Sequence, residues 1–284
     1  MFAPRERGSE PPVSSHPVRA GLSSSESELP PRAARPGGIR EGARVLRLAL
    51  RAGRDPLPFY RQAAAGAVRY LRGLSVPLAG ARILDAGTGT GAIAEALSAA
   101  GARVVALDLD DRRPPAVTRT PFVRGSAERL PFRQGAFDGV ISSNVLEHVP
   151  DPFAMVRELT GACRPGGFVY LSWTNWLSPF GGHEMSPFHY LGPRLAARAY
   201  GWVRGRPPHT NVPGRNLFVL HVGDVLRRLR GSGLVIRDVA PRYWPSLRFI
   251  ARVPVLREVA MWNCVILLRR PGRGGGGPER RPVR

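Results

Sequence analysis

The sequence predicts an α/β protein with a doubly wound sheet of seven strands, mostly parallel, with an antiparallel last strand and helices on both faces. Two observations lead to the α/β class and the parallel part of this prediction. A glycine-rich loop, 87–91, joins an apolar run to an alanine-rich segment, as in a strand–loop–helix unit. Further apolar runs alternate with segments of helical pattern along most of the chain. Alternating strands and helices favour a parallel sheet that is covered on both faces.

Two helices are expected ahead of the sheet. Residues 40–54 mix leucine and valine with arginine, and Pro56 and Pro58 break the helix after them. A second helix is expected over 59–74. Basic amphipathic helices can lie on a membrane, but we favour packing of both helices on their own domain.

The strands follow one another in a regular order. They are expected at 81–86, 103–108, 120–124, 137–143, 168–173, 234–239 and 265–268. Helices are expected at 90–100, 151–163 and 222–230, whereas Pro114 and Pro115 leave the helix within 110–117 short or absent. Arg164 to Gly167 end the helix before the fifth strand. Residues 174–216 interrupt the alternation with proline, glycine, histidine and aromatic residues.

One domain is expected over 39–271, in which 39–75 form a helical cover and 174–216 a lid. Residues 1–38 and 272–284 are poor in large apolar residues and are expected to be disordered. Translation starting later than Met1 is a further possibility. Met1 to Gly38 contain no signal-peptide core, and no apolar run approaches the length of a membrane span.

The composition is strongly basic. The formal net charge is +21, and all 42 basic residues are arginine. Residues 55–268 alone hold 26 arginines against 15 acidic residues. Such a charge suits nucleic acid, anionic lipid or an acidic substrate; a genome rich in G and C gives the same excess, and we favour that explanation. Two cysteines without metal-site spacing indicate a reduced, cytoplasmic compartment.

The glycine loop predicts a nucleoside-containing cofactor. Glycines allow a tight turn and the close approach of a ligand, and this loop opens a helix N-terminus. Asp108 ends the next strand, 17 residues past Gly91, where such a unit places an acid for ribose hydroxyls. Residues 89–94 also fit the looser GxGxxA pattern of a dinucleotide site. Asp85 ahead of the turn disfavours a pyrophosphate and suits a cationic ligand.

Four motifs then occur in order, from the glycine loop through 123–132 (VRGSAERLPF) and 137–152 (FDGVISSNVLEHVPDP) to 164–167 (RPGG). Together they resemble the class I S-adenosylmethionine-dependent methyltransferases, which have a Rossmann-like fold. Residues 176–185, 189–192, 241–243 and 253–258 are similar to an uncharacterised group of actinobacterial methyltransferases. We expect an S-adenosylmethionine-dependent enzyme that methylates a small-molecule or lipid-like acceptor at oxygen or nitrogen.

The resemblance implies a role for each matching residue. Asp85 holds the methionine ammonium, Asp108 accepts from the ribose hydroxyls, and Leu109 packs on adenine. Many relatives carry Asp in place of Ser126, so adenine recognition is expected to rest on its neighbours. The expected cofactor-binding set is Asp85, Ala86, Gly87, Thr88, Gly89, Gly91, Asp108, Leu109, Ser126, Ala127, Glu128, Ser143 and Asn144.

The acceptor is expected beyond the carboxyl end of strand 137–143. His148 is the catalytic candidate there, because an imidazole with a pKa of about 6.5 can accept a proton near neutral pH; an equal alternative is that it orients the loop. The expected substrate pocket consists of Tyr60, Trp176, His183, His189 and Tyr190. The alternative for these aromatic residues is that they only cover the sheet edge.

No metal is expected. Some relatives bind a divalent ion through Glu-x-x-Glu-His, but here Asn144 replaces the first acid, and an amide oxygen is a weaker ligand for a hard cation. His183 and Glu184 leave such a site conceivable. An RNA methyltransferase, a non-catalytic cofactor-binding protein and an NAD-dependent oxidoreductase are the competing functions. Peripheral membrane contact and the oligomeric state stay open.

Overall fold

The computed structural model describes residues 38–51, 55–115 and 119–272 of the chain. Within these ranges seven strands form one sheet, in the order β3-β2-β1-β4-β5-β7-β6. β1 to β5 pair in parallel, and β7 is antiparallel to both β5 and β6. The strands are β1 (Arg82–Ala86), β2 (Arg103–Asp108), β3 (Phe122–Arg124), β4 (Phe137–Ser143), β5 (Cys163–Thr174), β6 (Val235–Pro241) and β7 (Asn263–Arg269). The predicted fold class is confirmed.

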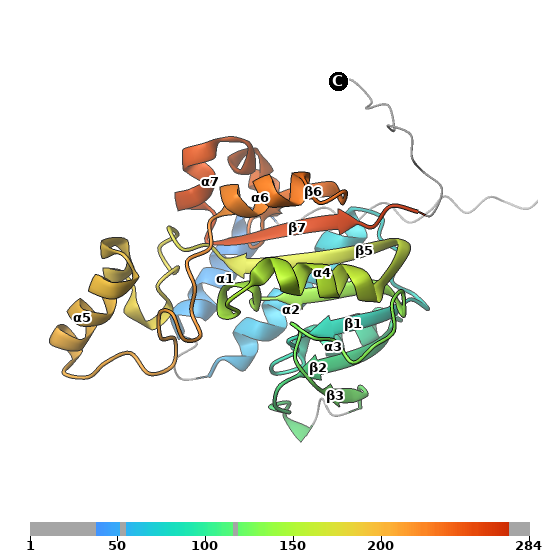
Figure 1. The fold of residues 1–284 in the computed structure, drawn as a ribbon, viewed down its shortest axis with the longest axis horizontal. Coiled ribbons are helices and arrows are strands. Elements are labelled where there is room, and N and C mark those ends of the chain that lie inside the picture. Colours follow the sequence, from blue (N-terminus) through green and yellow to red (C-terminus); the bar gives the residue numbers. More distant parts are fainter. Residues whose placement is uncertain (1–37, 52–54, 116–118, 273–284) are drawn as a thin grey trace, which may run out of the picture. The chain divides into compact units, whose positions relative to one another are not determined.

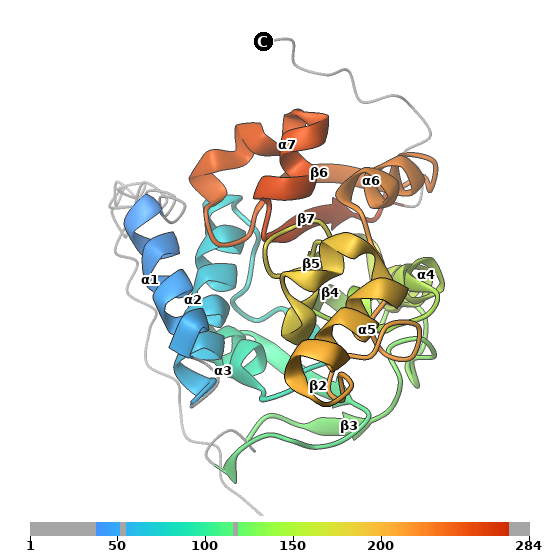
Figure 2. The same ribbon diagram turned by 90° about the vertical axis from the view of Figure 1, so that its left-hand side faces the viewer.

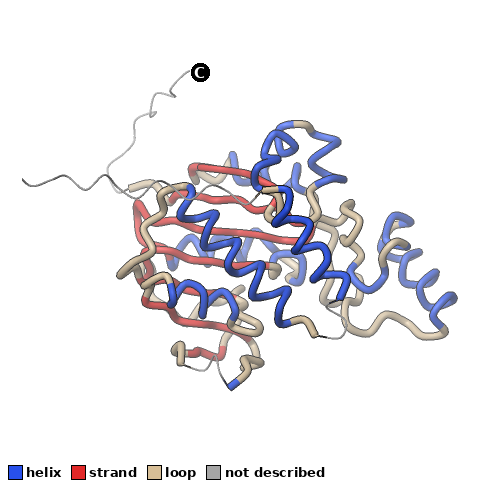
Figure 3. Tube along the Cα trace, turned by 180° about the vertical axis from the view of Figure 1, so that it is seen from behind, coloured by secondary structure: helices blue, strands red, loops and turns tan. Residues whose placement is uncertain are grey.

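Helices cover both faces of the sheet. α1 (Ile39–Arg51), α2 (Leu57–Gly73) and α3 (Ala92–Ala99) lie on one side, and α4 (Pro152–Ala162) and α6 (Val222–Arg230) on the other (Figures 1 and 2). Seen from behind, helices again lie in front of the strands (Figure 3).

Neighbouring strand residues point to opposite faces and enter two separate cores. Leu84 and Val140 pack with α4 and α6, whereas Ile83 and Ile141 pack with α2 and α3. This period of two explains why the central strands are continuously apolar, since both of their faces are buried.

The carboxyl ends of the parallel strands share one edge of the sheet, here called the carboxyl edge. In Figure 1 the arrowheads of β1 and β5 point toward the side where α5 (Pro193–Arg204) lies, and that of β7 points away. β6 ends at the same edge, because two antiparallel pairings through β7 return it to the direction of β5. Segments that follow β1, β2, β4, β5 and β6 therefore meet there.

Several helices appear where the sequence predicted none. They are α5 and the 3₁₀ helices His183–Met185 and Phe188–Leu191 in the lid, and Pro245–Arg252 and α7 (Pro254–Ala260) after β6; the 3₁₀ helix Leu146–His148 follows β4. Pro193, Pro245 and Pro254 stand in the first turn of their helices. Proline fits that position because the first amide protons of a helix have no partner within it. Reading proline only as a helix breaker was the error.

β5 also differs from the prediction, because it begins at Cys163 rather than at residue 168. Phe137 pairs with Cys163, and after an irregularity Gly139 pairs with Phe168. Gly166, with φ of +77°, lies in the irregular part. The RPGG segment therefore belongs to the strand as a bulge, which a glycine with positive φ permits.

Some predictions concern residues that are not described. Residues 1–37 and 273–284 lie outside the described ranges, and so do 52–54 and 116–118. The expected disorder of 1–38 and 272–284 falls almost entirely there, as do the ends of the segments 40–54 and 110–117. None of the described helices is long and apolar enough to cross a membrane.

Candidate functional site

The glycine loop between β1 and α3 is tied to the end of β2. The amides of Gly87 and Thr88 both donate to the Leu107 carbonyl, at 2.8 and 3.0 Å. Gly87 and Gly89 have φ of +78° and +54°, a conformation that glycine adopts without steric cost. A Cβ added to Gly89 would meet no atom within 4 Å. The loop therefore leaves open space for a ligand beside its backbone.

Asp85 lies beneath this loop and is almost wholly buried, with 1% of its surface exposed. It accepts a 2.6 Å hydrogen bond from the Thr88 hydroxyl. The pKa of Asp85 is raised to about 6, mainly by burial and further by the nearby Asp108 carboxylate. Hydrogen bonds from Thr88 and the Ala94 amide, and the positive charge of Arg242, act in the opposite direction. Near neutral pH the site thus holds a buried carboxylate that is poised to receive a cation.

Asp108 lies on the other side of the loop. Its two carboxylate oxygens accept from the amides of Gly89 and Leu109, each at 2.8 Å. An ionised carboxylate has about four acceptor positions, so both oxygens can still accept from a pair of hydroxyls. Leu109, beside it, is 61% exposed and offers an apolar surface.

The 126–128 segment follows β3 next to Asp108. The Gly125 amide donates to the Asp108 carbonyl at 2.9 Å, which brings Ser126 to the carboxyl edge. The Ser126 hydroxyl accepts from the Glu128 amide at 3.1 Å, and Ala127 is buried. The expected cofactor-binding residues of β1, β2 and β3 are therefore gathered at one edge.

Ser143 and Asn144 end β4 and face β5 and the β6 end. The Ser172 hydroxyl donates to that of Ser143 at 3.2 Å. Asn144 has φ of +56°, and its side-chain oxygen accepts from Asn263 at 2.8 Å and from Arg242 at 3.2 Å. This oxygen is fully engaged by protein donors.

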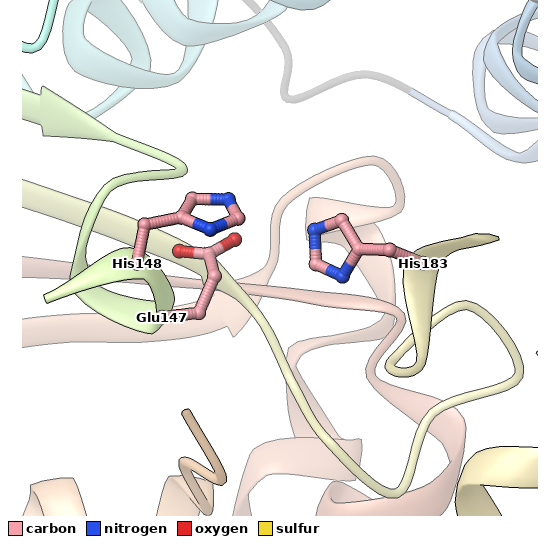
Figure 4. A group of neighbouring side chains, drawn as sticks. All are labelled: Glu147, His148 and His183. Carbon is pink, nitrogen blue, oxygen red and sulfur yellow. The ribbon is translucent and has the colours of Figure 1, made fainter. Parts of the chain in front are cut away.

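Glu147, His148 and His183 form a compact cluster (Figure 4). Each offers one ligand atom, and these atoms lie within 4.8 Å of one another. Glu147 is 1% exposed; one oxygen accepts from the Thr174 amide at 2.9 Å, and the other has no hydrogen-bond partner. The two imidazole centroids are 5.2 Å apart. The cluster joins the end of β4 to the lid.

Backbone carbonyls hold both imidazoles in place. Nδ1 of His148 lies 2.7 Å from the Asn216 carbonyl oxygen and Nδ1 of His183 lies 3.3 Å from that of Gly181. We assign a proton to Nδ1 in each ring, because a carbonyl can only accept; in the neutral form of the ring, Nε2 then keeps its lone pair. Burial lowers the pKa of His183, with Glu147 opposing this and His148 adding to it, so this ring is neutral near pH 7.

The Nε2 atoms of two imidazoles and the free oxygen of a carboxylate can take up a proton or hold a divalent cation. The absence of a metal therefore stays a prediction.

The other expected pocket residues lie apart from this cluster. Trp176 and His189 are buried in the core of the lid, their rings 5.7 Å apart, and Nε2 of His189 donates to the Ser178 carbonyl at 3.0 Å. Tyr190 and Tyr60 are 51% and 40% exposed. Of the five expected residues, His183 is the one that the structure places beside His148.

The expected site residues do not include an aromatic wall and one arginine that the structure shows. The wall consists of Phe59 from α2, Phe180 from the lid, and Tyr243 and Trp262 on either side of the segment between β6 and β7. Phe180 stacks on Trp262 with centroids 4.2 Å apart, and Tyr243 meets Trp262 at 4.7 Å. Arg242 and Tyr243 directly follow β6. Had that strand been extended to residue 241, its carboxyl end would have indicated them.

Known proteins resemble the chain over most of its length. A family model described as a methyltransferase domain matches residues 84–171. An uncharacterised methyltransferase of Mycobacteroides abscessus is 41% identical over 204 residues, which cover 68% of this chain and 78% of that protein. One of Mycobacterium tuberculosis is 40% identical over 227 residues, covering 76% and 89%. A solved S-adenosylmethionine-dependent methyltransferase from Mesorhizobium loti is 24% identical with a TM-score of 0.49, covering 73% and 98%.

Proposed function

The chain belongs to the class I S-adenosylmethionine-dependent methyltransferases, with relatives in actinobacteria, and we propose that it methylates a small-molecule or lipid-like acceptor. The acceptor atom in this proposal is oxygen or nitrogen. The observation that supports methyl transfer from S-adenosylmethionine is the hydrogen-bonded array of Asp85, the glycine loop and Asp108 at the carboxyl edge. S-adenosylmethionine supplies an electrophilic methyl group on a sulfonium; the residues of the chain bind, orient and exclude water.

The charges of this array fit such a cofactor. Asp85 is a buried carboxylate for the methionine ammonium, and Asp108 keeps free acceptor positions for two ribose hydroxyls. The open space beside Gly89 allows the cofactor to approach the backbone of the loop closely. Leu109 offers its exposed side chain to the adenine, and Ser126 and Glu128 offer polar groups beside it.

The acceptor is proposed to sit between Ser143 and His148. A proton leaving an acceptor oxygen or nitrogen would pass to Nε2 of His148, whose ring the Asn216 carbonyl holds. A positioned base of this kind contributes typically 10²- to 10⁴-fold to a rate. In this proposal the aromatic wall and the lid exclude water from the acceptor. Exclusion of water favours in-line transfer of the methyl group to a bound acceptor.

The outer surface of the lid supports a lipid-like acceptor. Trp202 and Leu195 on α5 are 88% and 53% exposed, and Arg194 and Arg198 are exposed on the same helix. An apolar strip flanked by arginines suits an anionic lipid surface. Because α5 belongs to the segment that follows β5 at the carboxyl edge, peripheral contact would bring the lid to the membrane.

A methyl-transfer assay tests the proposal. Purified protein is incubated with S-adenosylmethionine labelled in its methyl group and with a cell extract separated into small-molecule, lipid and RNA fractions. We expect label in the lipid or small-molecule fraction, and none with Asp108→Ala. Label confined to RNA would favour the RNA methyltransferase, which the basic charge allows. S-adenosylmethionine binding without transfer to any fraction would favour a non-catalytic protein.

A further inference from the structure

Arg242 is a buried cation without an anionic partner. The residue is 8% exposed, and its side chain donates to the Asn144 side-chain oxygen at 3.2 Å. Its Nε atom is buried and makes no hydrogen bond. In the ranges that the structure describes, no carboxylate oxygen lies within 4.0 Å of the guanidinium. A buried charge in this state is costly unless a ligand pairs with it.

Two other arginines with covered guanidinium groups are paired more completely. Arg113, whose side chain is 4% exposed, forms an ion pair with Asp111 at 2.8 Å and donates to the Thr120 carbonyl at 2.7 Å. Arg270 donates to three backbone carbonyls at the end of α4. Arg242 differs from these two arginines, because its Nε atom has no acceptor.

A second unpartnered donor lies beside Arg242. The Tyr170 hydroxyl on β5 is buried without a hydrogen-bond partner. Burial raises the pKa of Tyr170, whereas the Arg242 guanidinium and the Ser172 side chain oppose this, so both lie close to the hydroxyl. Nε of Arg242 and the hydroxyl of Tyr170 are thus neighbouring buried donors without an acceptor, and the two oxygens of a carboxylate can accept from such a pair.

The surroundings keep Arg242 protonated. Burial lowers its pKa, but Tyr170, Tyr243, Glu147 and Asp85 outweigh this and the pKa is raised. Its electrostatic effect on Asp85 and its hydrogen bond to Asn144 place it at the methionine end of the proposed cofactor site. Asp85 and Arg242 thus offer one negative and one positive group to the same pocket.

We propose that Arg242, with the Tyr170 hydroxyl, binds a carboxylate at this end of the site. Two sources carry that chemistry: the methionine carboxylate of the cofactor and a carboxylate on the acceptor. With the first, Asp85 and Arg242 provide a counter-charge for each pole of the amino-acid zwitterion. This inference rests on the proposed function, because it places the pocket at the cofactor site.

Calorimetry of wild type and Arg242→Gln tests the first source. The ligands are S-adenosylhomocysteine, which has the carboxylate, and 5′-methylthioadenosine, which lacks the whole amino-acid part. We expect the variant to bind S-adenosylhomocysteine about 10- to 100-fold more weakly, since a charged hydrogen-bonded pair is lost. Binding of 5′-methylthioadenosine should not change. Arg248→Gln is the control, because Arg248 is already paired with Asp238 at 3.2 Å.

Benzoate titrated into the S-adenosylhomocysteine complex tests the second source. If S-adenosylhomocysteine affinity is unchanged but Arg242→Gln abolishes benzoate binding, the acceptor supplies the carboxylate. If the variant alters neither affinity, the proposal is overturned. Should Arg242→Gln not fold, Arg242→Lys keeps the charge without the fork geometry and is expected to bind the same ligand less tightly. Failure of wild type to bind S-adenosylhomocysteine would instead refute the proposed function.

Discussion

The cofactor half of the molecule, residues 82–148, and the acceptor half, residues 174–262, are built in different ways. In the first, side chains bond to backbone within or next to the glycine loop, as Asp108 does with Gly89. In the second, the aromatic wall joins three separate positions, Phe180, Tyr243 and Trp262, to Phe59 of α2, and Arg242 keeps an unpartnered donor. Short-range bonds along the chain therefore build the first half, whereas contacts between segments distant in the sequence build the second.

Replacing His148, which lies where the two halves meet, should have the largest effect on the rate of methyl transfer. For His148→Gln we expect methyl transfer to fall about 10²- to 10⁴-fold, the contribution of a positioned base. S-adenosylhomocysteine affinity should stay unchanged, because the imidazole is not assigned to the cofactor. The measurement is the transfer rate into the labelled fraction together with calorimetry.

His209→Gln is the matched control, since His209 is an exposed histidine of the lid. A transfer rate equal to that of wild type in His148→Gln would leave His148 with only the loop-orienting role.

A substitution at Gly87 should break the contact between the glycine loop and the end of β4. A Cβ there would overlap the Val145 side chain, and φ is +78°. Strain in this left-handed conformation and overpacking together should lower the free energy of unfolding of Gly87→Ala by about 2–4 kcal/mol. Urea denaturation measures this.

Gly89→Ala separates strain from overlap. Its φ is also positive, but nothing lies within 4 Å of the added Cβ, so a loss of only about 1–2 kcal/mol is expected. Equal losses of unfolding free energy in the two variants would show that the Val145 side chain moves aside at no energetic cost.

Asp85→Asn should stabilise the protein without ligand while impairing cofactor binding. Burial, the largest cause, raises the folded pKa of Asp85 to about 6, above the unfolded value of about 3.9. The ionised carboxylate therefore destabilises the fold, by an amount that grows as pH rises from about 4 to 6 and then stays constant. Above pH 6 we expect the variant to be more stable by up to about 3 kcal/mol.

Urea denaturation at pH 4 and pH 7.5 checks the sign. The stabilisation should fall below about 1 kcal/mol at pH 4, where the folded carboxyl is neutral and the unfolded one is about half ionised. Asp138→Asn is the opposite control: burial raises the pKa of Asp138, but its bonds with Arg82 and Arg164 outweigh this and lower it, so its loss should destabilise at pH 7.5. A less stable Asp85→Asn at pH 7.5 would contradict the account.

The smallest effect concerns the lid itself. One oxygen of Glu184 accepts from three successive amides, those of 209–211, at 2.7 to 3.0 Å. Burial would raise the pKa of Glu184, but these amides and His209 outweigh it and the pKa is lowered. Glu184→Gln removes the charge and should lower the free energy of unfolding by about 1 kcal/mol at neutral pH. This difference from wild type should disappear as the pH falls through the lowered pKa of Glu184.

Hydrogen exchange of the amides at 209–211 measures this, and a several-fold faster exchange is expected. Glu95→Gln on the exposed surface of α3 is the control. Unchanged exchange in Glu184→Gln would mean that the remaining amide oxygen suffices to hold the lid.

The same contrast explains what could be predicted from sequence. Asp85, Gly87 and Asp108 stand at fixed distances along one strand–loop–helix–strand unit, so spacing alone brings them together. The five parallel strands likewise follow from apolar runs that are buried on both faces, whereas these runs do not indicate the antiparallel direction of β7.

The acceptor half offered no such local signal. Arg242 is one of 42 arginines, and only its place after β6, once that strand is paired with β7, brings it to Asn144. Trp176 and His189 were expected in the pocket from residue type, yet side chains of the same type also form the core of the lid. Proline within 174–216 predicts an interruption of the strand–helix alternation, yet Pro193 begins α5.

The most direct test of the central claim is calorimetric titration of S-adenosylhomocysteine and NADH into the wild-type chain and into Asp108→Ala. Wild type should bind one S-adenosylhomocysteine per chain and no NADH. Asp108→Ala should bind it about 100-fold more weakly, because two hydrogen bonds to a charged carboxylate are lost, while Asp111→Ala should behave as wild type. A folded wild-type chain that binds NADH, or that does not bind S-adenosylhomocysteine, would contradict the assignment of the carboxyl edge as the cofactor site.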